Sequence, residues 1–144
     1  MMLIKDTFND RRSRREIERH VGKKFSFVDR FKMRGIGSQR MLIVDSSNEI
    51  ADLLALDKKL NHCNLELRQG GLLVRFQSKM HTYAFAIPWH YLTFFRTGES
   101  LQVYGQNNHV KLRVAHNEKL DRRFVLKVLQ FKALWSEDHP TLQM

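Results

Sequence analysis

The feature that most constrains the fold is a change of hydrophobic period at Cys63. From this residue onward apolar and polar side chains alternate, as in Leu65 and Leu67 with their charged neighbours. Strands show this period of two because successive side chains point to opposite faces of a sheet. Gly70 and Gly71 then supply turn geometry ahead of a second alternating run, so the two runs are predicted to form a β-hairpin.

Further strands are predicted towards the C-terminus. Residues 81–87 and 91–95 flank Pro88, which cannot donate a hydrogen bond and belongs at a strand end or edge. Turns rich in Gly, Ser and Asn precede the next apolar runs, at 101–104 and 110–114. Because short turns join antiparallel neighbours, the chain is predicted to be an α+β protein with a mainly antiparallel sheet.

A C-terminal amphipathic helix is predicted over residues 119–135. Its apolar side chains recur every three to four residues: Leu120, Phe124, Val128, Phe131 and Trp135. The opposite side is also apolar, so we expect it to be covered by the N-terminal third of the chain or by a partner. In a homo-oligomer the interface candidates are Val125, Leu126 and Leu129. Residues 136–144 are expected to be a loose tail.

Two more helices are predicted in the N-terminal part. Residues 7–21 combine capping-box spacing with two apolar residues four apart on one face. Residues 48–60 follow the same logic, because Ser46 and Glu49 stand at capping-box spacing ahead of a leucine-rich run. Between the helices, aromatic residues in 25–33 alternate with charge, which predicts a strand or an irregular wrap.

One domain is expected from the 144 residues, which suffice for a sizeable core. We expect a basic extension at 1–40 that packs on or flanks a β-rich domain at 41–135. Cys63 is the only cysteine, so no intrachain disulfide can form and the cytoplasm is the expected location. Residues 80–95 form the longest stretch free of Lys, Arg, Asp and Glu, which is shorter than the ~20 residues of a spanning helix. No transmembrane segment is therefore expected.

The net charge of +10 is concentrated near the N-terminus. Residues 1–40 contain twelve Lys and Arg against five acidic residues, whereas residues 41–144 contain thirteen against ten. This asymmetry indicates attraction to an acidic partner. The anion-binding candidates are the basic side chains of one segment: Arg11, Arg12, Arg14, Arg15, Arg19, Lys23 and Lys24.

These charges favour a non-enzymatic binding domain that contacts an acidic protein or an anionic surface. Sequence-independent nucleic-acid binding through the segment from Arg11 to Lys24 is an alternative, because clustered guanidinium groups bind phosphates and release counterions. A solvated helix face or a mobile arm is the simplest interpretation of the same residues.

No catalytic constellation is visible, so the sequence favours a non-enzyme, and no cofactor or metal is expected. His62 and Cys63 are neighbours on a predicted strand and point to opposite faces, so they cannot act together as base and nucleophile. The seven histidines lack the close pair spacing of local metal ligands. One alternative is a small-ligand carrier or enzyme whose pocket, between the sheet and helix 48–60, contains His81, His90 or Tyr91.

The charge-free stretch is also rich in aromatic residues: Tyr83, Phe85, Trp89, Tyr91, Phe94 and Phe95. If exposed, such rings would suit stacking on single-stranded nucleic acid. However, Tyr83 and Phe85 share one face of the predicted strand 81–87, and Ala84 and Ala86 share the other. Apolar residues on both faces are typical of a strand that is buried on both faces. We therefore expect these aromatic residues in the core.

Several patterns follow the order of a known architecture: Gly70-Gly71-Leu72-Leu73, Ile87-Pro88-Trp89, Glu99-Ser100-Leu101-Gln102-Val103 and the helix face from Phe124 to Trp135. In this order, over about residues 63–135, they resemble bacterial pleckstrin-homology-like domains. The resemblance implies a bent sheet or partly open barrel capped by a C-terminal helix. Lipid-binding members of the wider superfamily carry a basic cluster around the first hairpin, whereas here only Arg68, Arg75 and Lys79 lie near that turn.

Overall fold

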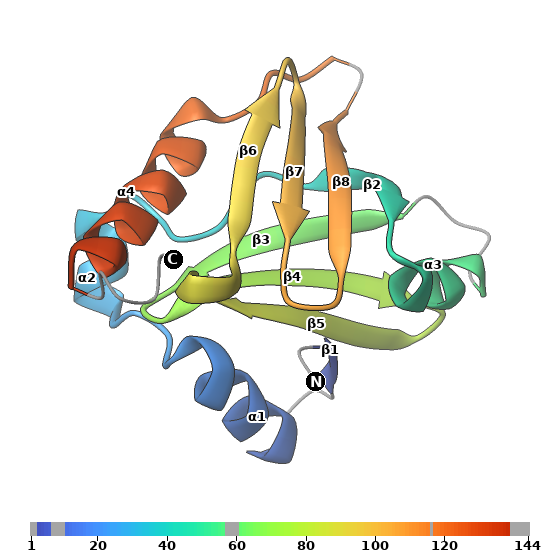
Figure 1. The fold of residues 1–144 in the computed structure, drawn as a ribbon, viewed down its shortest axis with the longest axis horizontal. Coiled ribbons are helices and arrows are strands. Elements are labelled where there is room, and N and C mark those ends of the chain that lie inside the picture. Colours follow the sequence, from blue (N-terminus) through green and yellow to red (C-terminus); the bar gives the residue numbers. More distant parts are fainter. Residues whose placement is uncertain (1–2, 7–10, 57–60, 116, 139–144) are drawn as a thin grey trace.

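A computed structural model shows an α+β protein with one open, eight-stranded antiparallel sheet (Figure 1). It describes residues 3–6, 11–56, 61–115 and 117–138. The strands are β1 (Leu3–Asp6), β2 (Met41–Ser46), β3 (His62–Arg68), β4 (Gly71–Ser78), β5 (His81–Pro88), β6 (Thr93–Thr97), β7 (Ser100–Tyr104) and β8 (His109–Val114). The helices are α1 (Arg11–Val21), α2 (Phe27–Lys32), α3 (Asn48–Ala55), the short 3-10 helix η1 (Trp89–Tyr91) and α4 (Arg122–Asp138).

The strands lie in the order β1-β5-β4-β3-β2-β8-β7-β6. Two antiparallel meanders, β3-β4-β5 and β6-β7-β8, run crosswise to each other in Figure 1, so the sheet is bent. β2 joins them, because Met41 is paired with Cys63 on one side and with Val114 on the other. The predicted antiparallel arrangement is confirmed, but the strands after residue 62 do not form one continuous meander. The chain turns a corner after Pro88, and β5 and β6 are not neighbours.

The main core fills the concave side of the sheet. Most of its members come from β2 to β8 and from the inner stripe of α4, where Phe124, Val125 and Val128 are buried; Leu3 of β1 also belongs to it. Ile50 and Leu54 of α3 close another side of the same core. Full burial of one such side chain stabilises the fold by about 1.5–3 kcal/mol, so α3 and α4 are held mainly by these contacts.

A second, smaller core lies on the outer face of β4 and β5. There Ile17 and Val21 of α1 pack against Leu73, Ala84 and Ala86, all of them buried. The small alanine side chains let the helix approach the sheet closely. The prediction that the strand carrying Ala84 and Ala86, β5, is buried on both faces is confirmed.

Several elements differ from their predicted form near the N-terminus. Residues 27–32 are helical rather than extended, because Ser26 caps α2 by accepting a hydrogen bond from Asp29 N (3.1 Å). β1 was not predicted; it pairs with β5, so residues 3–6 extend the sheet itself. α1 begins at Arg11, and residues 7–10 of the predicted helix lie outside the described residues.

The other two helices differ at their ends. α3 ends at Ala55, and residues 57–60 of its predicted span lie outside the described residues. Its N-cap is Ser47 rather than Ser46, and the Ser47 hydroxyl donates to Asn108 Oδ1 (2.6 Å) instead of capping the helix. α4 continues to Asp138, three residues beyond its predicted end, and residues 139–144 are not described. None of the helices in the described ranges combines the length and apolar character needed to cross a bilayer.

Candidate anion-binding surface

α1 is an amphipathic helix with one buried face. Ser13, Ile17 and Val21 lie four residues apart, and all three are buried against the sheet. This spacing places them on one side of a helix with 3.6 residues per turn. The arginines of α1 are exposed, whereas Glu16, Glu18 and His20 are partly buried.

The C-terminal end of α1 is fixed to the turn between β3 and β4. Gly22 ends the helix with a φ of 79°, and its N–H donates to Glu18 O (2.8 Å). Gly70 N donates to Val21 O (2.7 Å). A Cβ atom on Gly70 would lie only 2.9 Å from the carbonyl carbon of Val21, so the close approach requires glycine here.

A buried arginine reinforces this attachment. Arg68 is 2% exposed, and its Nη1 donates to Gly22 O (3.1 Å) while its Nε donates to Glu66 Oε2 (2.5 Å). Glu66 also accepts from Arg75 Nη1 (2.8 Å). Burial alone would raise the pKa of Glu66, but Arg75 and Arg68 outweigh it and hold this pKa below its ordinary value. The ion-pair network therefore fixes the orientation of α1 through its last turn.

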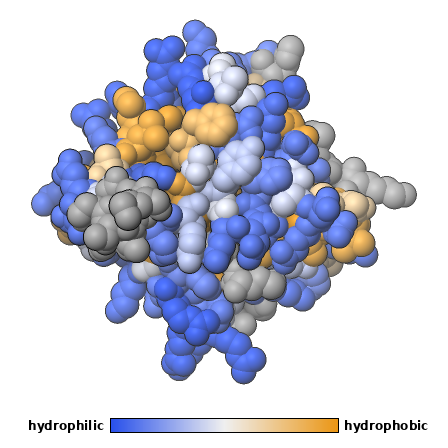
Figure 2. Space-filling model, viewed as in Figure 1, coloured by the Kyte–Doolittle hydropathy of each residue, from blue (hydrophilic) through white to orange (hydrophobic). Residues whose placement is uncertain are grey.

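The outward face of α1 is strongly basic. Arg11, Arg12, Arg15 and Arg19 line a shallow hollow of about 570 Å³ together with Glu16, which forms an ion pair with Arg19 (2.6 Å). Side chains on the side of the molecule where α1 lies are hydrophilic and project outward (Figure 2). Residues 11–24 contain seven basic residues and two acidic ones.

Four of the seven predicted anion-binding residues line this hollow, and Arg14, Lys23 and Lys24 do not. All seven are exposed, and six are held close together by α1 and its capping turn: Arg11, Arg12, Arg14, Arg15, Arg19, Lys23, followed directly by Lys24. Within the described part of the chain, no carboxylate lies within 4 Å of Arg11, Arg14 or Arg15. Because α1 packs on the sheet, its arginines are presented by a docked helix and not by a mobile arm.

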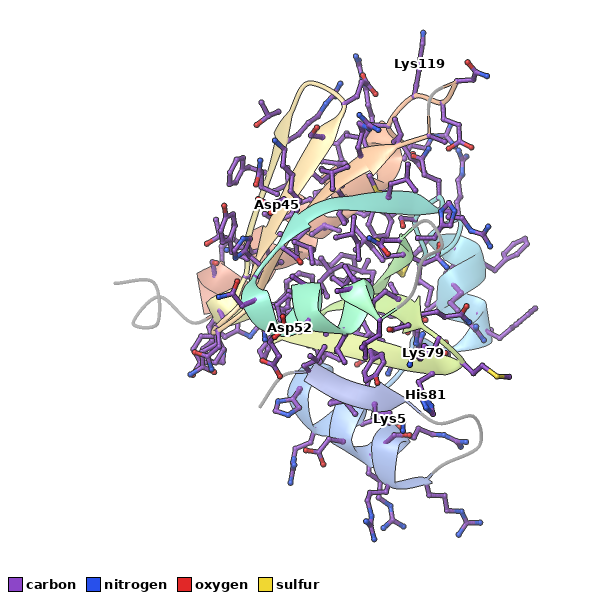
Figure 3. The ribbon with its side chains drawn as sticks, turned by 90° about the vertical axis from the view of Figure 1, so that its right-hand side faces the viewer. Lys5, Asp45, Asp52, Lys79, His81 and Lys119 are labelled. Atoms are coloured by element: carbon purple, nitrogen blue, oxygen red, sulfur yellow. The ribbon has the colours of Figure 1, made fainter. Side chains whose placement is uncertain are left out.

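Other predicted site residues are scattered. Among the described residues, no group of three His, Cys, Asp or Glu side chains could hold a metal ion. Cys63 is buried, and burial raises the pKa of its thiol to about 12, which suppresses the reactive thiolate. His81, His90 and Tyr91 are exposed, and Figure 3 shows His81 beside β1 with its ring directed outward.

The space between α3 and the sheet is largely filled. Ile50 and Leu54 are buried there, and the hollow beside α3 has a volume of about 300 Å³ lined by residues of β2 and α3. His81, His90 and Tyr91 do not line it. The structure thus gives no support to the small-ligand alternative.

The predicted interface residues on α4 divide between core and surface. Val125 is buried, whereas Leu126 is 56% and Leu129 is 40% exposed. Apolar side chains are visible on the side of the molecule where α4 lies in Figure 2. The N-terminal segment covers α4 only in part, through the Phe25–Phe131 ring contact (5.5 Å between centroids) and the hydrogen bond from Lys127 Nζ to Gly35 O (3.0 Å). Self-association through α4 stays a prediction.

The aromatic stretch was predicted to lie in the core, which is correct for three of its six residues; Tyr83 is partly buried, and Tyr91 and Phe95 are exposed. Phe85, Trp89 and Phe94 are buried, whereas Phe95 is 44% exposed and stacks on Tyr104 of the neighbouring strand. Among the described residues, Phe27 and Phe31 are the most exposed aromatic residues, and both belong to the segment that was predicted to be a strand or an irregular wrap. Their spacing of four residues next to the capping residue Ser26 was the signal for the short helix that carries them.

Comparison of the chain with protein-family models, with curated proteins and with solved structures gave no match. The class of protein rests on the fold alone: an α+β domain with an open antiparallel sheet, a C-terminal helix and a docked basic helix on its outer face.

Proposed function

We propose that the protein is a non-enzymatic binding domain that contacts an acidic partner through the outward face of α1. The observation that carries this proposal is the docking of α1. Its apolar side and its last turn are fixed to the sheet, while Arg11, Arg14 and Arg15 extend into solvent without a described acidic partner.

A docked helix is well suited to bind an extended anion. Guanidinium groups form paired hydrogen bonds with carboxylates and phosphates, and several of them on one face attract a polyanion over a distance. Because α1 is already ordered, binding does not have to pay the entropy of folding the helix. The partner we favour is an anionic surface or an acidic protein in the cytoplasm.

We further infer that the scaffold is pleckstrin-homology-like. The bent antiparallel sheet and the C-terminal helix whose inner face enters the core support this inference. The proposed contact surface differs from the basic first hairpin of lipid-binding members, because the β3–β4 turn is occupied by the end of α1.

The test is elution from immobilised heparin in a salt gradient. The variant Arg11→Gln, Arg14→Gln, Arg15→Gln removes three charges from α1 and keeps good helix formers. A control variant, Arg113→Gln, Arg122→Gln, Arg123→Gln, removes the same charge from exposed positions elsewhere. We expect the α1 variant to elute at clearly lower salt than the control.

Equal elution of the two variants would show that overall charge, and not α1, determines the interaction, and the proposal would be abandoned. Retardation of DNA or RNA that is lost in the α1 variant would identify the acidic partner as a nucleic acid. In that case binding should weaken steeply with salt.

A further inference from the structure

α2 projects two phenylalanine rings into solvent. Phe27 is 78% exposed and Phe31 is 81% exposed, and Val28 between them is 59% exposed. None of the six residues of α2 is buried. Exposed side chains of this size are unusual, and two of them one helical turn apart form an apolar tip.

The helix that carries this tip is well formed. Ser26 caps its first turn, and Gly35 N donates to Arg30 O (2.8 Å) at its end, where Arg34 and Gly35 have φ values of 60° and 97°. This is the hydrogen-bond pattern of a helix C-cap. The two rings are therefore exposed on a helix that is capped at both ends.

Buried residues hold the segment on both sides of α2. Phe25 is buried and contacts the ring of Phe131 in α4. Ile36 is buried, and its carbonyl accepts a hydrogen bond from Leu67 N in β3 (2.7 Å). The segment is thus fixed to the core before and after α2, whereas α2 itself lies at the surface.

Basic residues flank the apolar tip along the chain. Residues 23–34 contain five basic residues and one acidic residue, Asp29. Four of the basic ones are exposed, and the guanidinium of Arg30 lies 5.9 Å from the centre of the Phe27 ring. The exposed four are Lys23, Lys24, Lys32 and Arg34.

This composition distinguishes between two kinds of partner. Protein interfaces are depleted in lysine, whereas a membrane surface with anionic lipids attracts both lysine and arginine. Aromatic side chains partition into the boundary between lipid headgroups and acyl chains. Phenylalanine at the tip with lysines flanking it therefore fits a lipid surface better than a protein groove.

We propose that α2 inserts Phe27 and Phe31 into the interface of an anionic phospholipid membrane, with the flanking lysines and Arg34 at the headgroups. This inference rests on the proposed function and deepens it, because it makes the anionic partner of the basic N-terminal region a lipid surface. Binding would require both charge and insertion, since the apolar tip is small.

The first experiment is sedimentation with phospholipid vesicles. The full chain should bind vesicles containing phosphatidylserine and not vesicles of phosphatidylcholine alone. We expect Phe27→Ser, Phe31→Ser to bind at least about tenfold more weakly, because two large apolar side chains no longer leave water. A matched variant, Met80→Ser, Phe95→Ser, removes exposed apolar groups elsewhere and should bind as the parent does.

The second experiment reports insertion directly. In Phe27→Trp, the added tryptophan should shift its emission to the blue with phosphatidylserine vesicles and not with heparin, after subtraction of the parent spectrum. An unshifted emission on bound vesicles, or equal binding to both lipid compositions, overturns the inference.

The two proposals can fail separately. If the chain does not bind phosphatidylserine vesicles while the α1 variant still elutes early from heparin, the insertion proposal is wrong and the proposed anion-binding surface on α1 is retained. If vesicle binding depends on Phe27 and Phe31 but heparin elution does not depend on α1, the basic surface is wrong. A third outcome is that the parent binds single-stranded DNA but no vesicles, and that the Phe27→Ser, Phe31→Ser variant loses DNA binding. This outcome would assign the rings to base stacking and overturn the membrane proposal.

Discussion

Gly71 is the position where an added methyl group would disturb the packing of α1 on the sheet most directly. A Cβ atom there would lie 2.1 Å from the backbone oxygen of Ile87 and 2.9 Å from Val21 Cγ1. Backbone atoms cannot rotate away, so β4 and β5 would have to separate by roughly 1.2–1.5 Å to restore an ordinary carbon–oxygen contact. The same shift would press on the last turn of α1.

We expect Gly71→Ala to lower the free energy of unfolding by about 2–3 kcal/mol, the upper part of the range for overpacking a close-packed site. For a domain of this size, the melting temperature should fall by roughly 6–10 °C. The measurement is urea unfolding followed by tryptophan fluorescence. Trp89 is a suitable reporter, because it is buried and donates its Nε1–H to Gln69 O (2.9 Å), two residues before Gly71.

Gly37→Ala is the matched control. A Cβ atom at residue 37 would meet Leu65 O at 3.7 Å, which is an ordinary contact. Its free energy of unfolding should stay within about 0.5 kcal/mol of the parent. If Gly71→Ala proves as stable as this control, the close packing of the β3–β4 turn against β5 and α1 is refuted.

Three more predictions concern single side chains. Glu66→Gln should lower the free energy of unfolding at neutral pH by about 2 kcal/mol, since it removes the charged acceptor of two arginines. The pKa of Glu66 is lowered in the folded state, so its carboxylate contributes fully to the free energy of unfolding above the ordinary pKa of 4.5, and this contribution is lost as the pH falls through the folded-state pKa. Identical acid unfolding of the parent and the variant would contradict this. Cys63 should react with a thiol reagent only after urea unfolding, and rapid modification of the folded chain would show that it is accessible. Val125→Ala should lower the melting temperature because the side chain is buried, whereas Leu126→Ala should leave it unchanged; equal effects would place the two residues in similar surroundings.

Much of the fold could be predicted from local patterns. Alternation around Leu65 and Leu67 identified β3, and the glycines after it identified the hairpin with β4. The stripe through Phe124 and Val128 identified α4 and its buried face. These signals are strong because a strand or a helix with one buried face repeats its apolar residues at a fixed period.

Other elements could not be found in this way. α2 buries none of its residues, so it has no apolar stripe that points to a core, and its aromatic residues indicated a strand or an irregular wrap instead. β1 has only four residues and exists through its pairing with β5. The capping role assigned to Ser46 was wrong because Ser46 still belongs to β2, where it is paired with Val110 of β8, and Ser47 is the N-cap residue.

The candidate site was predicted in part. Every basic residue of the segment from Arg11 to Lys24 was visible as charge, but charge alone does not distinguish a docked helix from a mobile arm. The attachment through Arg68 and Gly70 decides this, and these two residues lie more than forty positions after α1.

The sequence by itself determined which segments alternate, which segment forms the C-terminal helix and where the positive charge is concentrated, because these properties depend on neighbours along the chain. Only the tertiary structure decided that β2 joins two crossed meanders, that α1 lies on the alanine face of β5 and that Phe27 and Phe31 are left in solvent. Such outcomes depend on which distant surfaces become buried against each other, and a side chain is exposed or buried only with respect to those partners.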